Sequence, residues 1–188
     1  MRVGVIGLGT GTLAAYGRAG DRFRFYEINP QVVRYANESF SYLSDSAADV
    51  VTRVGDARVL LEGESSRRFD VLVVDAFHGD SIPLHLLTAE AFDLYRRRLA
   101  ENGVIAVHVT NRHLDLEPVV GAHAARMAMT AVSIHDLEGP SESRWMLMTD
   151  DLALLARPRI AAAARPAPLG GPQLAWTDDH ANLLQVLQ

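Results

Sequence analysis

The sequence contains no cysteine, so the chain cannot form a disulfide, a thiolate nucleophile or a cysteine metal site. It also carries little net charge, −5 from 18 Lys and Arg against 23 Asp and Glu. This mildly acidic balance gives no electrostatic reason to expect a nucleic acid or an anionic membrane as partner. No apolar run reaches the roughly 18 to 20 residues that a spanning helix needs, and no signal peptide precedes the first predicted strand. We therefore expect a cytoplasmic domain with no membrane contact of its own.

Apolar β-type runs alternate with helical segments along the 188 residues, which is typical of a mostly parallel sheet covered by helices on both faces. The sequence therefore predicts an α/β fold with a seven-stranded, mostly parallel sheet that ends in an antiparallel C-terminal strand pair. The predicted strands cover residues 2–7, 22–27, 50–54, 70–75, 104–109, 131–136 and 144–149. We assign residues 1–188 to a single domain, in which residues 157–175, rich in Ala, Pro and Gly, form a loosely packed arm.

Three glycines separate the first predicted strand from the helix that follows it. Gly7, Gly9 and Gly11 allow the backbone to turn tightly and to approach a ligand without Cβ atoms in the way. Folds that bind NAD usually have G-x-G-x-x-G/A, whereas here the third glycine comes one residue early. This shorter spacing resembles the S-adenosylmethionine-dependent methyltransferase fold, a Rossmann-like fold whose adenosyl ligand has no pyrophosphate.

Two acidic residues follow the next two predicted strands. Glu27 ends the second strand, where a carboxylate can accept hydrogen bonds from ribose hydroxyls; the alternative is a solvated side chain beside a tight turn. Asp56 and Ala57 follow the third strand in a Gly-Asp-Ala sequence, which is similar to the adenine-binding position of methyltransferase folds. In the other interpretation, Asp56 only caps the helix that begins at Ala57.

The loop after the fourth predicted strand holds the candidate catalytic residues. Asp75 closes the strand at the carboxyl edge of the sheet, where open α/β folds place their chemistry. His78 and Asp80 follow within six residues, and together the three groups could bind an amine cation or remove a proton from it. The alternative is that Asp80 caps a turn and His78 faces solvent.

The remaining polar candidates lie farther along the chain. His108 alternates with Val107 and Val109, which favours a histidine that faces the core or a helix. The histidine spacings resemble no metal site, so we expect no metal. Asp178 and Asp179 stand in a polar cluster between the arm and an apolar end. They either cap the last helix or bring negative charge over the mouth of the active site.

Three stretches of the sequence carry a resemblance to one family. Residues 70–92 (DVLVVDAFHGDSIPLHLLTAEAF), Val5–Pro30 and Trp176–Leu184 resemble the spermidine synthase (polyamine aminopropyltransferase) family, and more narrowly the C-terminal domains of bacterial members fused behind membrane segments. The resemblance implies transfer of an aminopropyl group from decarboxylated S-adenosylmethionine to an amine such as putrescine, with 5′-methylthioadenosine as the second product. Family members commonly dimerise, so a homodimer is possible.

Carried over by position, the family assigns the glycine loop and Glu27 to the nucleoside, Asp56 to adenine, and Asp75 to the first acid of the catalytic loop. Three departures stand out. Thr10 replaces the loop aspartate that faces the aminopropyl end of the donor, and His78 replaces the acid that deprotonates the amine. The N-terminal β-hairpin domain of the family is absent from these residues.

Three functions follow from these observations. The first is aminopropyl transfer, in which Asp75 and Asp80 hold and deprotonate the amine and Asp178 or Asp179 adds negative charge. The second is methyl transfer from S-adenosylmethionine to a small acceptor, because Thr10 could tolerate the carboxylate of the intact donor. The third is a non-catalytic domain that binds a nucleoside.

Overall fold

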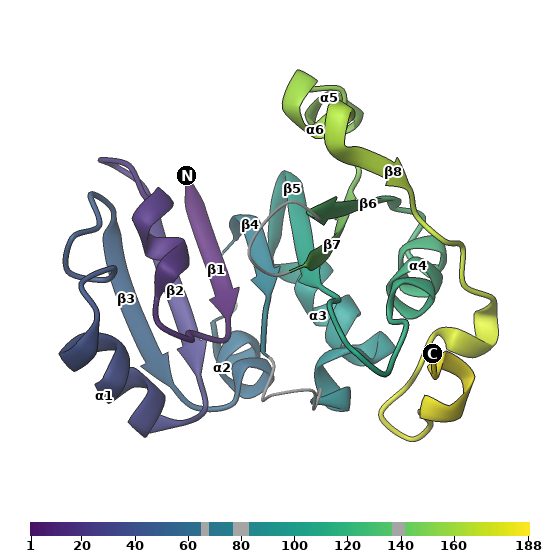
Figure 1. The fold of residues 1–188 in the computed structure, drawn as a ribbon, viewed down its shortest axis with the longest axis horizontal. Helices are drawn as coiled ribbons and strands as arrows, with labels where there is room; N and C mark the ends of the chain where they lie inside the picture. Colours follow the sequence, from purple (N-terminus) through teal and green to yellow (C-terminus); the bar gives the residue numbers. More distant parts are fainter. Residues whose placement is uncertain (65–67, 77–82, 137–141) are drawn as a thin grey trace.

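The computed structural model describes residues 1–64, 68–76, 83–136 and 142–188. An eight-stranded sheet in the order β3-β2-β1-β4-β5-β7-β6-β8 forms the centre of the molecule (Figure 1). The first five strands are parallel to one another, and the last three are joined in antiparallel pairs. The strands are β1 Arg2–Ile6, β2 Arg22–Glu27, β3 Asp49–Val54, β4 Phe69–Val74, β5 Leu99–His108, β6 Thr130–Asp136, β7 Ser143–Thr149 and β8 Ala164–Pro166.

Helices cover both faces of this sheet, as the sequence predicts. The helices are α1 Pro30–Ser39, α2 Ala57–Gly63, α3 Ala89–Arg98, α4 Glu117–Arg126, α5 Leu152–Leu155 and α6 Pro158–Ala163, with 3-10 turns η1 Thr12–Tyr16, η2 Leu84–Leu86, η3 Pro172–Leu174 and η4 Leu183–Val186. Side-chain alternation along the strands produces two apolar layers. One layer joins β-strand residues to α2, α3 and α4, and the other joins them to η1 and α1.

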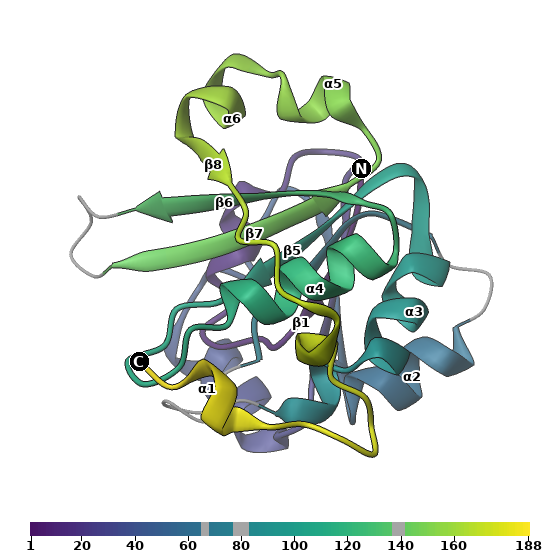
Figure 2. The ribbon, with the colours of Figure 1, turned by 90° about the vertical axis from the view of Figure 1, so that its right-hand side faces the viewer.

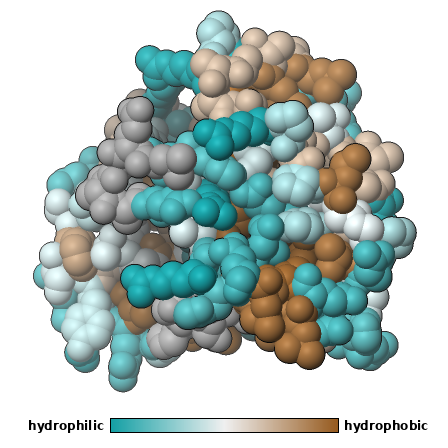
Figure 3. Space-filling view, turned by 45° about the vertical axis from the view of Figure 1, so that its right-hand side comes forward, coloured by the Kyte–Doolittle hydropathy of each residue, from teal (hydrophilic) through white to brown (hydrophobic). Residues whose placement is uncertain are grey.

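The sheet has one strand more than the sequence predicts. The extra strand, β8, pairs antiparallel with β6 through Val132 and Pro166 and lies in the segment expected to be a loose arm. The pattern could not show it, because three residues containing a proline are too short and too polar to carry a strand signal. Helix α6, in the same segment, and α5, just before it, lie beyond the edge of the sheet (Figure 2) and add apolar surface there (Figure 3).

The chain after β8 returns along α4 to the lower end of the sheet (Figure 2). Trp176 is 1% exposed and packs into the layer formed by α2, α3 and α4, and its carbonyl accepts a hydrogen bond from the N–H of Ala89 at the start of α3. The C-terminal segment, residues 172–188, is therefore attached to the core through Trp176, and Val186 is buried as well. Within the described residues, no helix has the length and apolar character needed to cross a membrane.

His123 in α4 is a polar residue inside this same core. Its side chain is completely buried, stacks on Phe92 with ring centroids 4.5 Å apart, and its Nε2 donates to the carbonyl of Leu87 at 2.9 Å. Its Nδ1 has no hydrogen-bond partner among the residues that the structure describes. Burial lowers the pKa of His123 from 6.5 to about 4, against a smaller opposing effect of the Leu87 hydrogen bond.

This shift predicts a loss of stability in mild acid. The unfolded chain takes up a proton at His123 below pH 6.5, whereas the folded chain does so only below about pH 4. The free energy of unfolding should therefore fall through this window by up to about 1.4 kcal/mol per pH unit. Urea unfolding at several pH values measures this fall in the free energy of unfolding. His123→Gln should flatten the dependence, and His113→Gln, on the surface, should not; an unchanged slope in His123→Gln would exclude this cause.

Candidate active site

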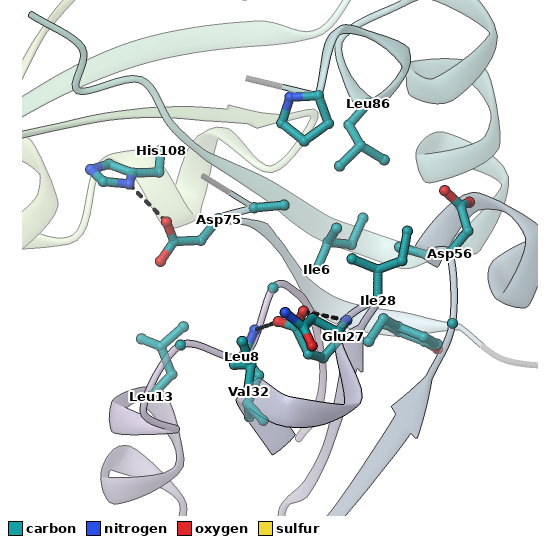
Figure 4. A pocket seen from close by; sticks show the side chains of 18 of the residues that line it. Ile6, Leu8, Leu13, Glu27, Ile28, Val32, Asp56, Asp75, Leu86 and His108 are labelled. Carbon is teal, nitrogen blue, oxygen red and sulfur yellow. Dashed lines mark hydrogen bonds and ion pairs between the residues drawn. The ribbon is translucent and has the colours of Figure 1, made fainter. Parts of the chain in front are cut away.

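A cavity of about 620 Å³ opens at the carboxyl ends of β1, β2 and β4 (Figure 4). This volume lies within the range of small-molecule sites. The glycine loop, the end of β2 and the start of α2 line one part of it, and Asp75, Pro83, His85 and His108 line another. Segments far apart in the sequence therefore meet at the sheet edge where parallel α/β folds bind their ligands.

The glycine loop has three residues in the left-handed region, of which Gly7 and Gly9 line the cavity and Gly11, against Leu43, does not. Gly7, Gly9 and Gly11 have φ values of 95°, 54° and 84°. A Cβ on Gly7 would lie 2.1 Å from the carbonyl oxygen of Asp75, whereas one on Gly9 would meet no atom within 4 Å. The missing side chain at Gly7 therefore allows β1 to lie against the end of β4. At Gly9 the space that a side chain would fill is open. Thr10 also lines the cavity, with its hydroxyl 2.8 Å from that of Thr12.

Glu27 is fixed at the cavity by the backbone. Its Oε2 accepts the N–H of Leu8 at 3.1 Å and its Oε1 accepts the N–H of Asn29 at 2.9 Å. Each carboxylate oxygen has a further lone pair. The side chain is thus oriented to accept hydrogen bonds from two neighbouring hydroxyl groups, which fits the predicted ribose contact.

Asp56 fits both interpretations of its sequence position. Its Oδ1 accepts the N–H of Val59 at 3.1 Å and so caps α2, and together with Ala57 it also lines the cavity. The second oxygen accepts from Nε2 of His85 at 3.0 Å. Sequence reasoning missed His85, because its contact with Asp56 joins two segments 29 positions apart.

Asp75 and His108 meet across the ends of β4 and β5. Nδ1 of His108 lies 2.7 Å from Oδ1 of Asp75 (Figure 4), and both residues line the cavity. The expectation of a core or helix-facing His108 is therefore wrong. Alternation correctly places it on the face opposite Val107, but at the end of β5 this face borders the cavity. Its position at the carboxyl end of the strand beside Asp75 was the available signal.

The other predicted acids stand apart from this group. His78 and Asp80 lie outside the described residues. Asp178 binds Arg58 with both oxygens, at 2.7 and 2.8 Å, and accepts the Thr88 hydroxyl at 2.7 Å. Neither Asp178 nor Asp179 is among the residues that line the cavity. The predicted helix cap is supplied instead by Asn182, whose side chain accepts the N–H of Leu184 at the start of η4.

Arg58 balances the charge of Asp178 and attaches the C-terminal segment to α2. The hydrogen bonds of Arg58, and then of Thr88, lower the pKa of Asp178 to about 2. Arg58 follows Ala57 directly and also donates to the carbonyl of His85 at 2.9 Å. The C-terminal segment thus supports one wall of the cavity from outside. Within the described part of the chain, no group of three or more acidic or histidine side chains is placed to hold a metal ion.

The fold and the site define a Rossmann-like domain of the methyltransferase type. Human methyltransferase-like protein 13, solved in complex with SAH, matches 99% of this chain and 89% of its own, with a TM-score of 0.63 and 18% identity. At this identity the match shows the fold. The mostly parallel sheet and the antiparallel C-terminal pair confirm the predicted architecture.

Two further matches, one in sequence and one in structure, point to one family within this fold class. A polyamine aminopropyltransferase of Vibrio vulnificus is 31% identical over 112 residues, which is 57% of this chain and 37% of that protein. A probable spermidine synthase from Corynebacterium glutamicum matches in structure with a TM-score of 0.61 and 26% identity, over 80% of this chain and 56% of its own. No family model matches the sequence. The chain is spermidine synthase-like in sequence and in fold, and the match spans well under half of the curated Vibrio relative.

The contact between the glycine loop and β4 predicts unequal effects of two alanine substitutions. Gly7→Ala combines a strained φ with a Cβ 2.1 Å from a backbone oxygen, so we expect the free energy of unfolding to fall by roughly 2 to 4 kcal/mol. In Gly9→Ala the added Cβ contacts no other atom, so the strained φ is the only cost. The free energy of unfolding should therefore fall by about 1 kcal/mol. Urea unfolding measures both. Equal losses would mean that Gly7 does not hold β1 and β4 together.

Proposed function

We propose that this chain is a transferase that moves the aminopropyl group of decarboxylated S-adenosylmethionine to a small amine such as putrescine. The observation that carries the proposal is the charge of the cavity. Its lining includes the carboxylates of Glu27, Asp56 and Asp75, and no Lys or Arg occurs among the lining residues that the structure describes. The proposed donor and acceptor are both cations, so an acidic cavity favours them.

Each part of the donor has a matching group in the cavity. Glu27 would accept the ribose hydroxyls, because its two oxygens are already oriented by backbone N–H groups. Asp56 would accept the adenine amino group at the start of α2. The glycine loop, with open space at Gly9, would lie against the nucleoside. The aminopropyl end would then extend toward Asp75.

The proposed reaction is a nucleophilic displacement. The lone pair of a neutral amine nitrogen attacks the propyl carbon bonded to the sulfonium sulfur, and the carbon–sulfur bond breaks with its electron pair moving to sulfur. Methylthioadenosine leaves, and the new ammonium loses a proton to restore a neutral amine. Asp75 would hold the amine beside the donor. A positioned base contributes roughly 10²- to 10⁴-fold to such a step, and we assign this role to the loop of His78 and Asp80.

Thr10 supports a second candidate, methyl transfer from S-adenosylmethionine to a small acceptor. The hydroxyl of Thr10 is neutral and lies beside that of Thr12. A neutral residue here does not repel the carboxylate of the intact donor, whereas the aspartate expected from the family would. The acidic lining favours aminopropyl transfer over this alternative, because the carboxylate would enter a cavity with three acidic groups.

Calorimetric titration distinguishes these candidates. Decarboxylated S-adenosylmethionine and methylthioadenosine should bind, and the intact donor should bind at least about tenfold more weakly because of charge repulsion. Preferential binding of the intact donor would exclude aminopropyl transfer and favour methyl transfer. Binding of methylthioadenosine with no turnover of any amine would favour a non-catalytic nucleoside-binding domain.

Asp75→Asn tests the proposed acceptor site directly. The substitution removes the negative charge that would hold the amine while keeping the shape of the side chain. Transfer to putrescine should fall by roughly 10- to 100-fold, the effect of weakening a hydrogen bond between charged groups, and methylthioadenosine affinity should stay within a few fold. Initial rates and calorimetry measure the two effects. Asp70→Asn, at the opposite end of β4, is the matched control and should retain transfer; full activity in Asp75→Asn would show that the acceptor site lies elsewhere.

A further inference from the structure

His108 is held at the edge of the cavity by contacts with Asp75, Thr110 and Trp145. Its Nδ1 lies 2.7 Å from Oδ1 of Asp75, and its Nε2 lies 2.7 Å from the hydroxyl of Thr110. Its ring stacks on Trp145 in β7, with centroids 4.7 Å apart and planes 20° from parallel. These contacts come from three segments of the chain, so the ring has one defined orientation.

Thr110 is itself fixed, which determines what His108 can donate. The Thr110 hydroxyl oxygen accepts the backbone N–H of Arg144 at 2.7 Å. Its own proton can be donated to Nε2 of His108, and a neutral imidazole then carries its proton on Nδ1. That tautomer donates to the carboxylate of Asp75. Backbone of β7 thus orients Thr110, Thr110 orients the imidazole, and the imidazole orients the acid.

As a result, the two carboxylate oxygens of Asp75 have different surroundings. Oδ1 is occupied by His108, whereas Oδ2 makes no hydrogen bond within the described part of the chain and points away from the imidazole (Figure 4). The Asp75 side chain is 36% exposed, so an unsupported carboxylate could rotate into solvent. With one oxygen held, the other is available at the cavity for a cationic nitrogen.

We infer that His108 is the positioning residue of the amine acceptor site: it fixes Asp75 so that Oδ2 binds the ammonium group of the acceptor. The inference rests on the proposed function for the identity of that ligand. Packing alone does not account for this histidine, because an aromatic hydrocarbon ring would stack equally well on Trp145. The two hydrogen bonds, one to Asp75 and one to Thr110, are what the imidazole adds.

Two substitutions at His108 separate positioning from packing. His108→Phe keeps a ring against Trp145 and removes both hydrogen bonds. His108→Asn loses the ring and keeps an N–H donor near the place of Nδ1, within reach of Asp75. His180→Phe, at an exposed residue of the C-terminal segment, is the control. The binding measurement is titration of putrescine into protein saturated with methylthioadenosine, and initial rates of transfer give kcat and KM for the amine.

We expect His108→Phe to weaken putrescine binding and raise its KM by roughly 10- to 100-fold, the effect of losing a hydrogen bond to a charged group. Affinity for methylthioadenosine should stay within about threefold of the original protein in every variant. His108→Asn should recover most of the amine affinity, and the His180→Phe control should match the original protein. Equal putrescine affinity in His108→Phe and the original protein would overturn the inference, as would failure of His108→Asn to recover it.

The same experiment separates this inference from the proposed function. Putrescine binding that depends on His108, without any aminopropyl transfer, would support the positioning role and overturn the proposed reaction. Transfer that proceeds equally in His108→Phe would support the reaction and overturn the role of His108. If the original protein binds methylthioadenosine but no amine, both proposals are wrong.

Discussion

The close approach of β1 to β4 is the constraint on which the site depends. The N–H of Asp75 donates to the carbonyl of Ile6 at 2.8 Å, and Gly7 lies so near the Asp75 carbonyl that no Cβ fits between them. The glycine loop and Asp75 therefore share one cavity because the residue after β1 has no side chain. Elsewhere a glycine turn need only bend the chain; here it also sets the distance between two functional groups.

Local sequence patterns predict the part of the site that depends on local structure. Strand ends, the glycine spacing, and the acids Glu27, Asp56 and Asp75 follow from periodicity and from the rule that parallel strands place their carboxyl ends at one edge. The contacts of His85, His108 and Arg58 join segments 27 to 120 positions apart. No periodicity encodes such pairs, so the sequence does not show which residues His85, His108 and Arg58 contact.

The acids of the cavity show how one fold can carry several like charges in a small space. Backbone N–H groups hold Glu27, an N–H of α2 and His85 hold Asp56, and His108 holds Asp75. Each carboxylate thus has a donor of its own and a fixed direction. These separate contacts let three acidic side chains share one cavity, each held in its own direction.

The two ends of the cavity depend on different parts of the chain, so substitutions can affect one end without the other. The end formed by the segments from β1 to α2 holds Glu27 through nearby backbone N–H groups and needs His85 from a distant segment to hold Asp56. The end at Asp75 needs β4, β5 and β7 together, because Asp75 depends on His108 and His108 on Thr110 and Trp145. Substitutions in the second group should therefore disturb Asp75 while leaving Glu27 and Asp56 in place. Thr10 lines the same cavity, and its neutral hydroxyl adds no charge to the carboxylates of Glu27, Asp56 and Asp75.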